Sequence, residues 1–142
     1  MTLLNLSKEL GELAVSRKLV LFSGAGASLG EINPMEVDSY PLFFIIPAGS
    51  HVVKDNTTTF SLTLYYIDRL LEDNTNTMDI FSSSIENLRN IIIGARDIPG
   101  VLDVADSYSV RNFMPEKMND RLCGAYAEVR ITVDNDFVCV EE

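Results

Sequence analysis

The sequence has few of the residues that support catalysis or metal binding. It contains one histidine and two cysteines in 142 residues. Cys123 and Cys139 form neither a CxxC motif nor the spacing of a zinc site, and both are predicted to be reduced core residues. His51 has no serine or cysteine nearby in the setting of an activated nucleophile, and it is interpreted as a residue at the rim of a strand. We therefore expect no catalytic residue, no cofactor, no metal site and no enzyme.

Basic residues are also scarce, which excludes one large class of partners. The chain contains 11 Lys and Arg residues and 21 Asp and Glu residues, so its formal net charge is −10. Affinity for nucleic acid depends on cations that neutralise phosphates, and this chain is not expected to read DNA or RNA. Part of the acidity lies in one segment, which lacks the spacing of an EF-hand and is interpreted as a hydrated loop, with weak binding of a hard cation as the alternative. Its residues are Asp68, Glu72, Asp73 and Asp79.

Long apolar runs are absent. Nowhere do about 18 apolar residues follow one another without a charge, so no membrane-spanning helix is expected. The first residues lack a basic start followed by an uninterrupted apolar segment, because Lys8 and Glu9 interrupt it. We expect no signal peptide, and hence synthesis in the cytoplasm.

Strand patterns organise the middle of the chain. With 46% hydrophobic residues, the chain can bury the core of one domain, residues 1–142. From residue 60 onward, apolar and polar residues alternate with period two, which is typical of a strand with one buried face. Residues 40–47 and 60–73 therefore predict a long antiparallel hairpin around one wet sheet face, with its polar tip at 54–59. The alternating apolar residues are Phe60, Leu62, Leu64 and Tyr66.

Two helices and four further strands complete the predicted fold. The first helix has a leucine stripe at residues 3, 6, 10 and 13. The second is predicted to begin at a capping box of Ser83 and Glu86, to bury Ile85 and Leu88 with residues 92 and 95, and to end before Pro99. Further strands are predicted at residues 18–22, 101–110, 122–133 and 137–140, with a loop at 112–120. The fold class is α+β, a single domain whose antiparallel β-sheet with a long hairpin packs against two α-helices.

A glycine-rich segment offers an alternative function. Residues 19–28 resemble the nucleotide-binding start of sirtuin-like NAD domains, in which glycines let backbone amides approach a pyrophosphate. Gly24, Gly26 and Gly30 miss the GxGxxG spacing because Leu29 stands at the third position, and Pro34 leaves little room for the required helix. A small nucleotide-binding enzyme domain is therefore the alternative, and a loop or bulge of small residues is the first interpretation.

Residues 40–95 resemble a known family. The pattern is Tyr40-Pro41, a hydrophobic strand ending near Pro47, the run 62–70, and then Glu72-Asp73, Asn76, Ile80 and Ser83. It resembles the neck and tail-terminator (tail-completion) proteins of tailed bacteriophages, including Bacteroidetes-infecting and crAss-like phages. The resemblance implies a structural virion protein without catalytic residues, assembled in the bacterial cytoplasm and located at the head–tail junction or tail. It implies a ring of six or twelve copies that contacts adjacent neck and tail proteins, while genomic DNA passes through without specific binding.

Two segments are predicted to form the contacts of such a ring. The hairpin tip is polar but flanked by valines, and the later loop carries apolar side chains that a monomer would not favour exposing. The acidic segments 68–79 and 134–136 are expected to face the channel or solvent, where six copies would place about −60 around the DNA. The candidate interface residues are Val52, Val53, Lys54, Thr57, Phe113, Met114 and Met118.

Overall fold

The computed structural model describes residues 1–16, 20–21, 41–69, 76–113 and 122–136. In these residues, two helices and seven strands form an α+β fold, which confirms the predicted class. The helices are α1 (Leu3–Ser16) and α2 (Thr77–Ala95). The strands are β1 (Val20–Leu21), β2 (Leu42–Pro47), β3 (Val52–Val53), β4 (Thr57–Arg69), β5 (Val101–Val104), β6 (Val110–Phe113) and β7 (Leu122–Asp134).

All seven strands belong to one sheet, ordered β1-β2-β4-β7-β5. The two 13-residue strands β4 and β7 pair antiparallel along their whole length and form its centre. Strands β2 and β3 both pair with β4 on one side, and β5 and β6 both pair with β7 on the other. Only β1 is parallel to its neighbour among these pairs. The predicted long hairpin is confirmed, because Leu42 pairs with Ile67 and Pro47 with Leu62.

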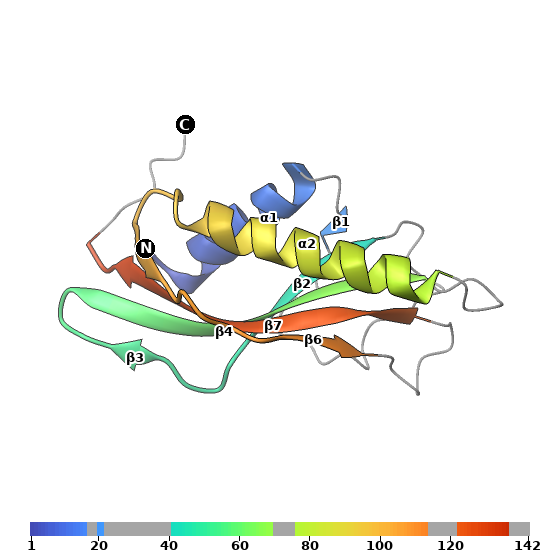
Figure 1. Cartoon of the computed structure of the whole chain (residues 1–142). Helices are drawn as coiled ribbons and strands as arrows, with labels where there is room; N and C mark the ends of the chain where they lie inside the picture. The colour runs from blue at the N-terminus through green and yellow to red at the C-terminus, as the bar shows by residue number, and fades with distance from the viewer. Residues whose placement is uncertain (17–19, 22–40, 70–75, 114–121, 137–142) are drawn as a thin grey trace.

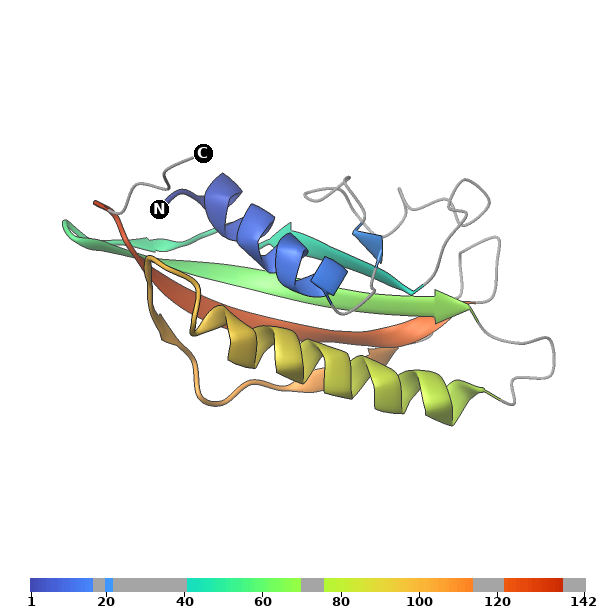
Figure 2. The same ribbon diagram turned by 90° about the horizontal axis from the view of Figure 1, so that it is seen from above.

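Both helices cover the same face of the sheet (Figures 1 and 2). The predicted alternation in β4 is confirmed, since its four apolar residues at 60, 62, 64 and 66 are buried in the core. Leu6 and Leu10 of α1 are fully buried in the same cluster. Opposite α2, strand β7 presents the small residues Cys123, Ala125 and Ala127, which let a helix lie close to the sheet. In the described residues, neither helix is long and apolar enough to cross a membrane.

The other face is wet at one end only. Leu42, Phe44 and Ile67 point to this face by strand alternation, yet all are buried and none belongs to the main core cluster. Phe44 stacks on Tyr65 with ring centroids 4.6 Å apart, and Tyr65 stacks on Tyr126 at 5.5 Å. The expectation of one wet sheet face therefore holds only for part of this face, because the sheet carries a second apolar cluster beside these rings.

Helix α2 begins at Thr77, six residues before the predicted capping box. Its buried stripe runs through Ile80, Ser84 and Leu88. The buried Ser84 hydroxyl has a hydrogen-bond partner, because it donates to the Ile80 carbonyl at 2.5 Å. Ile85 lies one position away from this stripe, about 100° around the helix, and is 43% exposed. The prediction that Ile85 packs on the sheet is wrong, whereas Leu88 is buried as predicted.

The predicted strand at residues 101–110 is two strands, β5 and β6. The register with β7 shifts between Val101 and Asp103, and the segment between the strands leaves the ladder after the Ala105 amide donates to the Arg130 carbonyl at 3.1 Å. Gly100, with φ 91°, makes the sharp turn before β5. Phe113 consequently belongs to β6 and not to a loop. The predicted loop from 114 onward, the glycine-rich segment at 24–30 and the strand at 137–140 lie outside the described residues.

Candidate functional site: the edges of the sheet

Strand β3 presents exposed apolar side chains at one edge of the sheet. Val52 pairs with Thr59 and Val53 with Thr58, so the two valines add a short ribbon beside β4. Their side chains are 58% and 73% exposed, respectively. Lys54 follows them and is also exposed. The structure thus places three of the predicted interface residues together at the surface.

The turn after β3 is held in place by Asn135. The Asn135 side-chain amide donates to the Lys54 carbonyl at 2.8 Å, and its oxygen accepts from the Thr58 hydroxyl at 2.5 Å. Its backbone amide donates to the Asn56 carbonyl at 3.0 Å. Because these bonds fix the turn on both sides, the exposed valines lie on a pre-formed edge, which lowers the entropy cost of binding.

Thr57 is the first residue of β4 and pairs with Asp134. The turn therefore covers residues 54–56, shorter than the predicted tip at 54–59. Thr58 is buried, and Thr59 shares a hydrogen bond of 2.8 Å with Thr132. Thr57 is thus a half-buried part of the central ladder, so removing residues 57–59 would disturb the sheet itself.

The second predicted contact segment lies far from the first within the sheet. Phe113 pairs with Gly124 near the start of β7, whereas the β3 ribbon lies beside the part of β4 that pairs with the end of β7. The two segments also flank different central strands, and they do not form one patch. Met114 and Met118 lie outside the described residues.

Leu102 is an exposed residue that the sequence analysis missed. It lies in β5, is 58% exposed, and falls at the register shift, so it has no partner residue in the β7 ladder. Beside it is an open hollow of about 160 Å³, which is lined by Arg96, Leu102, Asp103, Val104 and Asp106. A signal for this exposure was present in the sequence of β5, Val-Leu-Asp-Val. Val101 and Leu102 are adjacent apolar residues, and in a strand adjacent side chains point to opposite faces, so one of the two must point away from the core.

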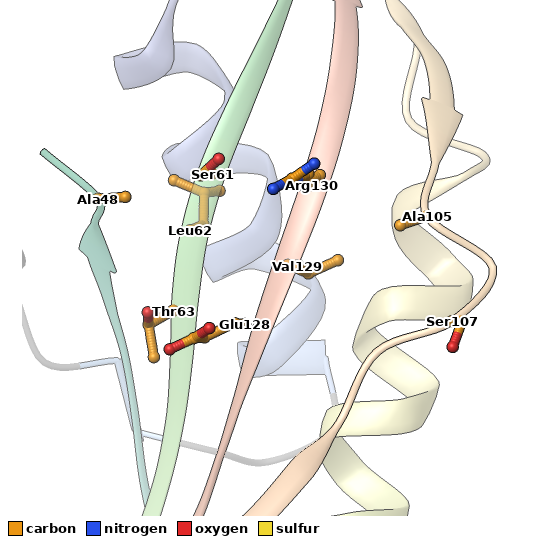
Figure 3. Close-up of a pocket in the computed structure, with 9 residues that line it drawn as sticks. All are labelled: Ala48, Ser61, Leu62, Thr63, Ala105, Ser107, Glu128, Val129 and Arg130. Carbon is orange, nitrogen blue, oxygen red and sulfur yellow. The ribbon is translucent and has the colours of Figure 1, made fainter. Parts of the chain in front are cut away.

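A polar groove of about 450 Å³ lies on the face opposite the helices (Figure 3). Ser61 and Thr63 from β4 line its floor beside Glu128 and Arg130 from β7. These residues can form hydrogen bonds and one ion pair with an extended ligand. His51 does not activate the Ser61 hydroxyl, because its Nδ1 atom accepts from the Ser61 backbone amide at 3.2 Å.

Burial governs the two strongly shifted titratable groups of the core. Burial raises the pKa of the Cys123 thiol to about 11 and that of Tyr66 to about 12, and the nearby Asp68 carboxylate adds to both increases. Cys123 is a free, buried thiol, as predicted, and its protonated form is a poor nucleophile. Across the part of the chain that the structure describes, no three His, Cys, Asp or Glu side chains gather as a metal site. Glu72 and Asp73 lie outside that part.

No known protein family matches the chain, and no curated protein matches it either.

Proposed function

We propose that this chain is a structural virion protein of a tailed bacteriophage, a ring-forming head–tail connector or tail terminator around the DNA channel. The observation that carries the proposal is the pair of exposed apolar edges, β3 and β5, on opposite sides of one sheet. A ring of identical subunits needs two different surfaces on each copy, which meet head to tail. Two such edges on one sheet can supply them.

The charge of the chain also supports this proposal. At a net charge of −10 per copy, a ring would surround its channel with negative potential. DNA phosphates would then be repelled from the wall, and the genome could pass without binding. The resemblance of residues 40–95 to neck and tail-terminator proteins adds the location, a head–tail junction or tail. The proposal includes no reaction and no cofactor.

Removal of the gene from a phage that carries it tests the proposal. We expect filled heads and unattached tails, with infectivity restored when the chain is supplied from a plasmid, and gold-labelled antibody at the neck or tail of normal particles. Normal tailed particles in the absence of the chain would contradict the proposal. Micromolar binding of NAD or ATP that is lost on Gly26→Val would instead favour the nucleotide-binding alternative.

A further inference from the structure

The two exposed edges lie at the same end of the sheet. Val52 pairs with Thr59 and Val101 pairs with Val133, while the central strands pair Thr59 with Thr132 and Thr58 with Val133. The β3 edge and the β5 edge thus lie at the same end of the β4–β7 ribbon, on opposite sides of it. Copies placed side by side would bring the β3 edge of one next to the β5 edge of the next.

The β3 edge can accept another strand through its backbone. The Lys54 amide donates to the Thr57 carbonyl at 2.8 Å, which makes these residues a hydrogen-bonded pair. In an antiparallel ladder, hydrogen-bonded pairs alternate with non-hydrogen-bonded pairs, so the next pair, Val53 with Thr58, is of the second kind. In such a pair the backbone amide and carbonyl of each residue point away from the partner strand. The polar backbone groups of Val53 therefore point outward, toward a neighbour.

The β5 edge carries a hollow with carboxylates beside an exposed leucine. Leu102 lies outside the β7 ladder and borders the hollow of about 160 Å³. Asp103 and Asp106 line the same hollow, and Asp106 is paired with Arg96 at 3.3 Å. On the other edge, Val53 is followed by the cationic Lys54. An apolar projection with a cation thus meets a hollow that combines the apolar Leu102 and Val104 with two carboxylates, one of which is already paired with Arg96.

We propose that the β3 edge of one copy docks on the β5 edge of a second copy of this chain. Val53 enters the hollow beside Leu102, and the Lys54 ammonium lies near the carboxylates of Asp103 and Asp106. This contact rests on the proposed function and extends it by naming which surfaces join neighbouring subunits. The contact is heterologous, so an open row of copies keeps one free β3 edge at one end and one free β5 edge at the other until the ring closes.

Two variants that each block one edge test the pairing. Val53→Glu brings a carboxylate toward Asp103 and Asp106, and Leu102→Glu blocks the hollow. Each variant alone should remain a monomer by analytical ultracentrifugation at concentrations where the unmodified chain self-associates. Their equimolar mixture should form a dimer and nothing larger, because one intact β3 edge then meets one intact β5 edge. Leu4→Glu, at a 73% exposed apolar residue of α1, is the matched control and should self-associate normally.

Disulfide trapping covers the case of weak association in isolation. In a Cys139→Ser background, the double variant Val53→Cys, Leu102→Cys should form a ladder of disulfide-linked oligomers on oxidation, because paired strands bring Cα atoms within the required distance. Val53→Cys alone should give no ladder. If the double variant yields no more cross-linked product than the single variants, the pairing is wrong. A dimer of Leu102→Glu alone would instead indicate symmetric contact between two β3 edges and would also overturn it.

Particle assembly separates this inference from the proposed function. If Val53→Glu and Leu102→Glu both enter infectious particles at normal levels, the edge pairing fails while the virion role stands. If tailed particles form without the chain, the virion role fails whatever the edges do. If the pairing is right, both variants should be incorporated at least tenfold less than the Leu4→Glu control.

Discussion

At the scale of single residues, Gly124 marks a close approach between the backbones of β4 and β7. It pairs with Ile67 in the centre of the sheet, and a Cβ atom at this position would overlap the Tyr66 carbonyl oxygen. Backbone in a central ladder cannot move aside without breaking hydrogen bonds, so only glycine fits here.

We expect Gly124→Ala to lower the free energy of unfolding by roughly 1–3 kcal/mol, as overpacking does in dense interiors. Urea titration followed by circular dichroism measures the change. Gly49→Ala is the matched control, because a Cβ atom there would meet nothing within 4 Å. Equal stability of the two variants would show that β4 and β7 are not in such close contact.

The raised pKa values of Cys123 and Tyr66 predict a loss of stability in alkali. In the unfolded chain these groups lose their protons near their ordinary pKa values of 9.0 and 10.0, whereas in the folded chain they keep them until about 11 and 12. Between these limits the folded state binds more protons, so the free energy of unfolding falls as pH rises. The stabilisation is complete below the unfolded pKa values and is lost as pH passes the folded ones.

Tyr66→Phe should make the decline above about pH 10 shallower, because it removes one of the groups whose pKa is raised in the folded chain; burial also raises the pKa of Tyr65, which stays in the variant. Denaturation in urea at a series of pH values from about 8 to about 12 measures the slope. A slope identical to that of the unmodified chain would mean that Tyr66 ionises freely in the folded state.

At the scale of elements, helix α2 has apolar residues both in the core and at the surface. Leu88 is fully buried, whereas Ile85, three residues earlier, is 43% exposed. Leu88 packs in the cluster that contains Leu62 and Leu64 of β4, so it joins the helix to the sheet.

Leu88→Ala should cost on the order of 2–4 kcal/mol of unfolding free energy, since it leaves a cavity between helix and sheet. Ile85→Ala should change it by less than about 0.5 kcal/mol, because a partly exposed side chain loses little burial. Both values come from the same urea titrations. A cost for Ile85→Ala that matches that of Leu88→Ala would place the helix in a different rotation.

At the scale of the whole molecule, net charge opposes the contact that the edges favour. Two copies of −10 repel one another, and the screening length falls from about 30 Å at 0.01 M salt to about 3 Å at 1 M. The attraction of Lys54 for the carboxylates across the contact is screened as well, but an exposed pair contributes only about 0–1 kcal/mol.

Self-association of the full chain should therefore strengthen as sodium chloride rises across that range. Sedimentation velocity at one fixed protein concentration measures the effect. Leu102→Glu should stay monomeric throughout, because its edge contact is blocked. Weaker association at high salt would show that charge attraction, and not burial of Val53 and Leu102, drives the contact.

Local patterns determined the faces of the main elements. Alternating side chains in β4 and β7 and the leucine stripe of α1 follow from the geometry of a strand and a helix, so the sequence by itself determined which face of each of these elements is turned to the core. The class α+β and the pairing of β2 with β4 followed from the same patterns. Val52, Val53 and Lys54 were predictable as surface residues because they flank a polar turn.

Only the tertiary structure decided how distant segments pair. The start of α2 at Thr77 has no side-chain cap hydrogen bond from Asn76 that a capping motif could have signalled. The division of residues 101–110 into β5 and β6 depends on a register shift against β7. The exposure of Leu102 and the second apolar cluster at Leu42, Phe44 and Ile67 also depend on neighbours far away in the chain. Period and propensity describe one segment at a time, whereas register and edge position are set by contacts between segments, which no local pattern contains.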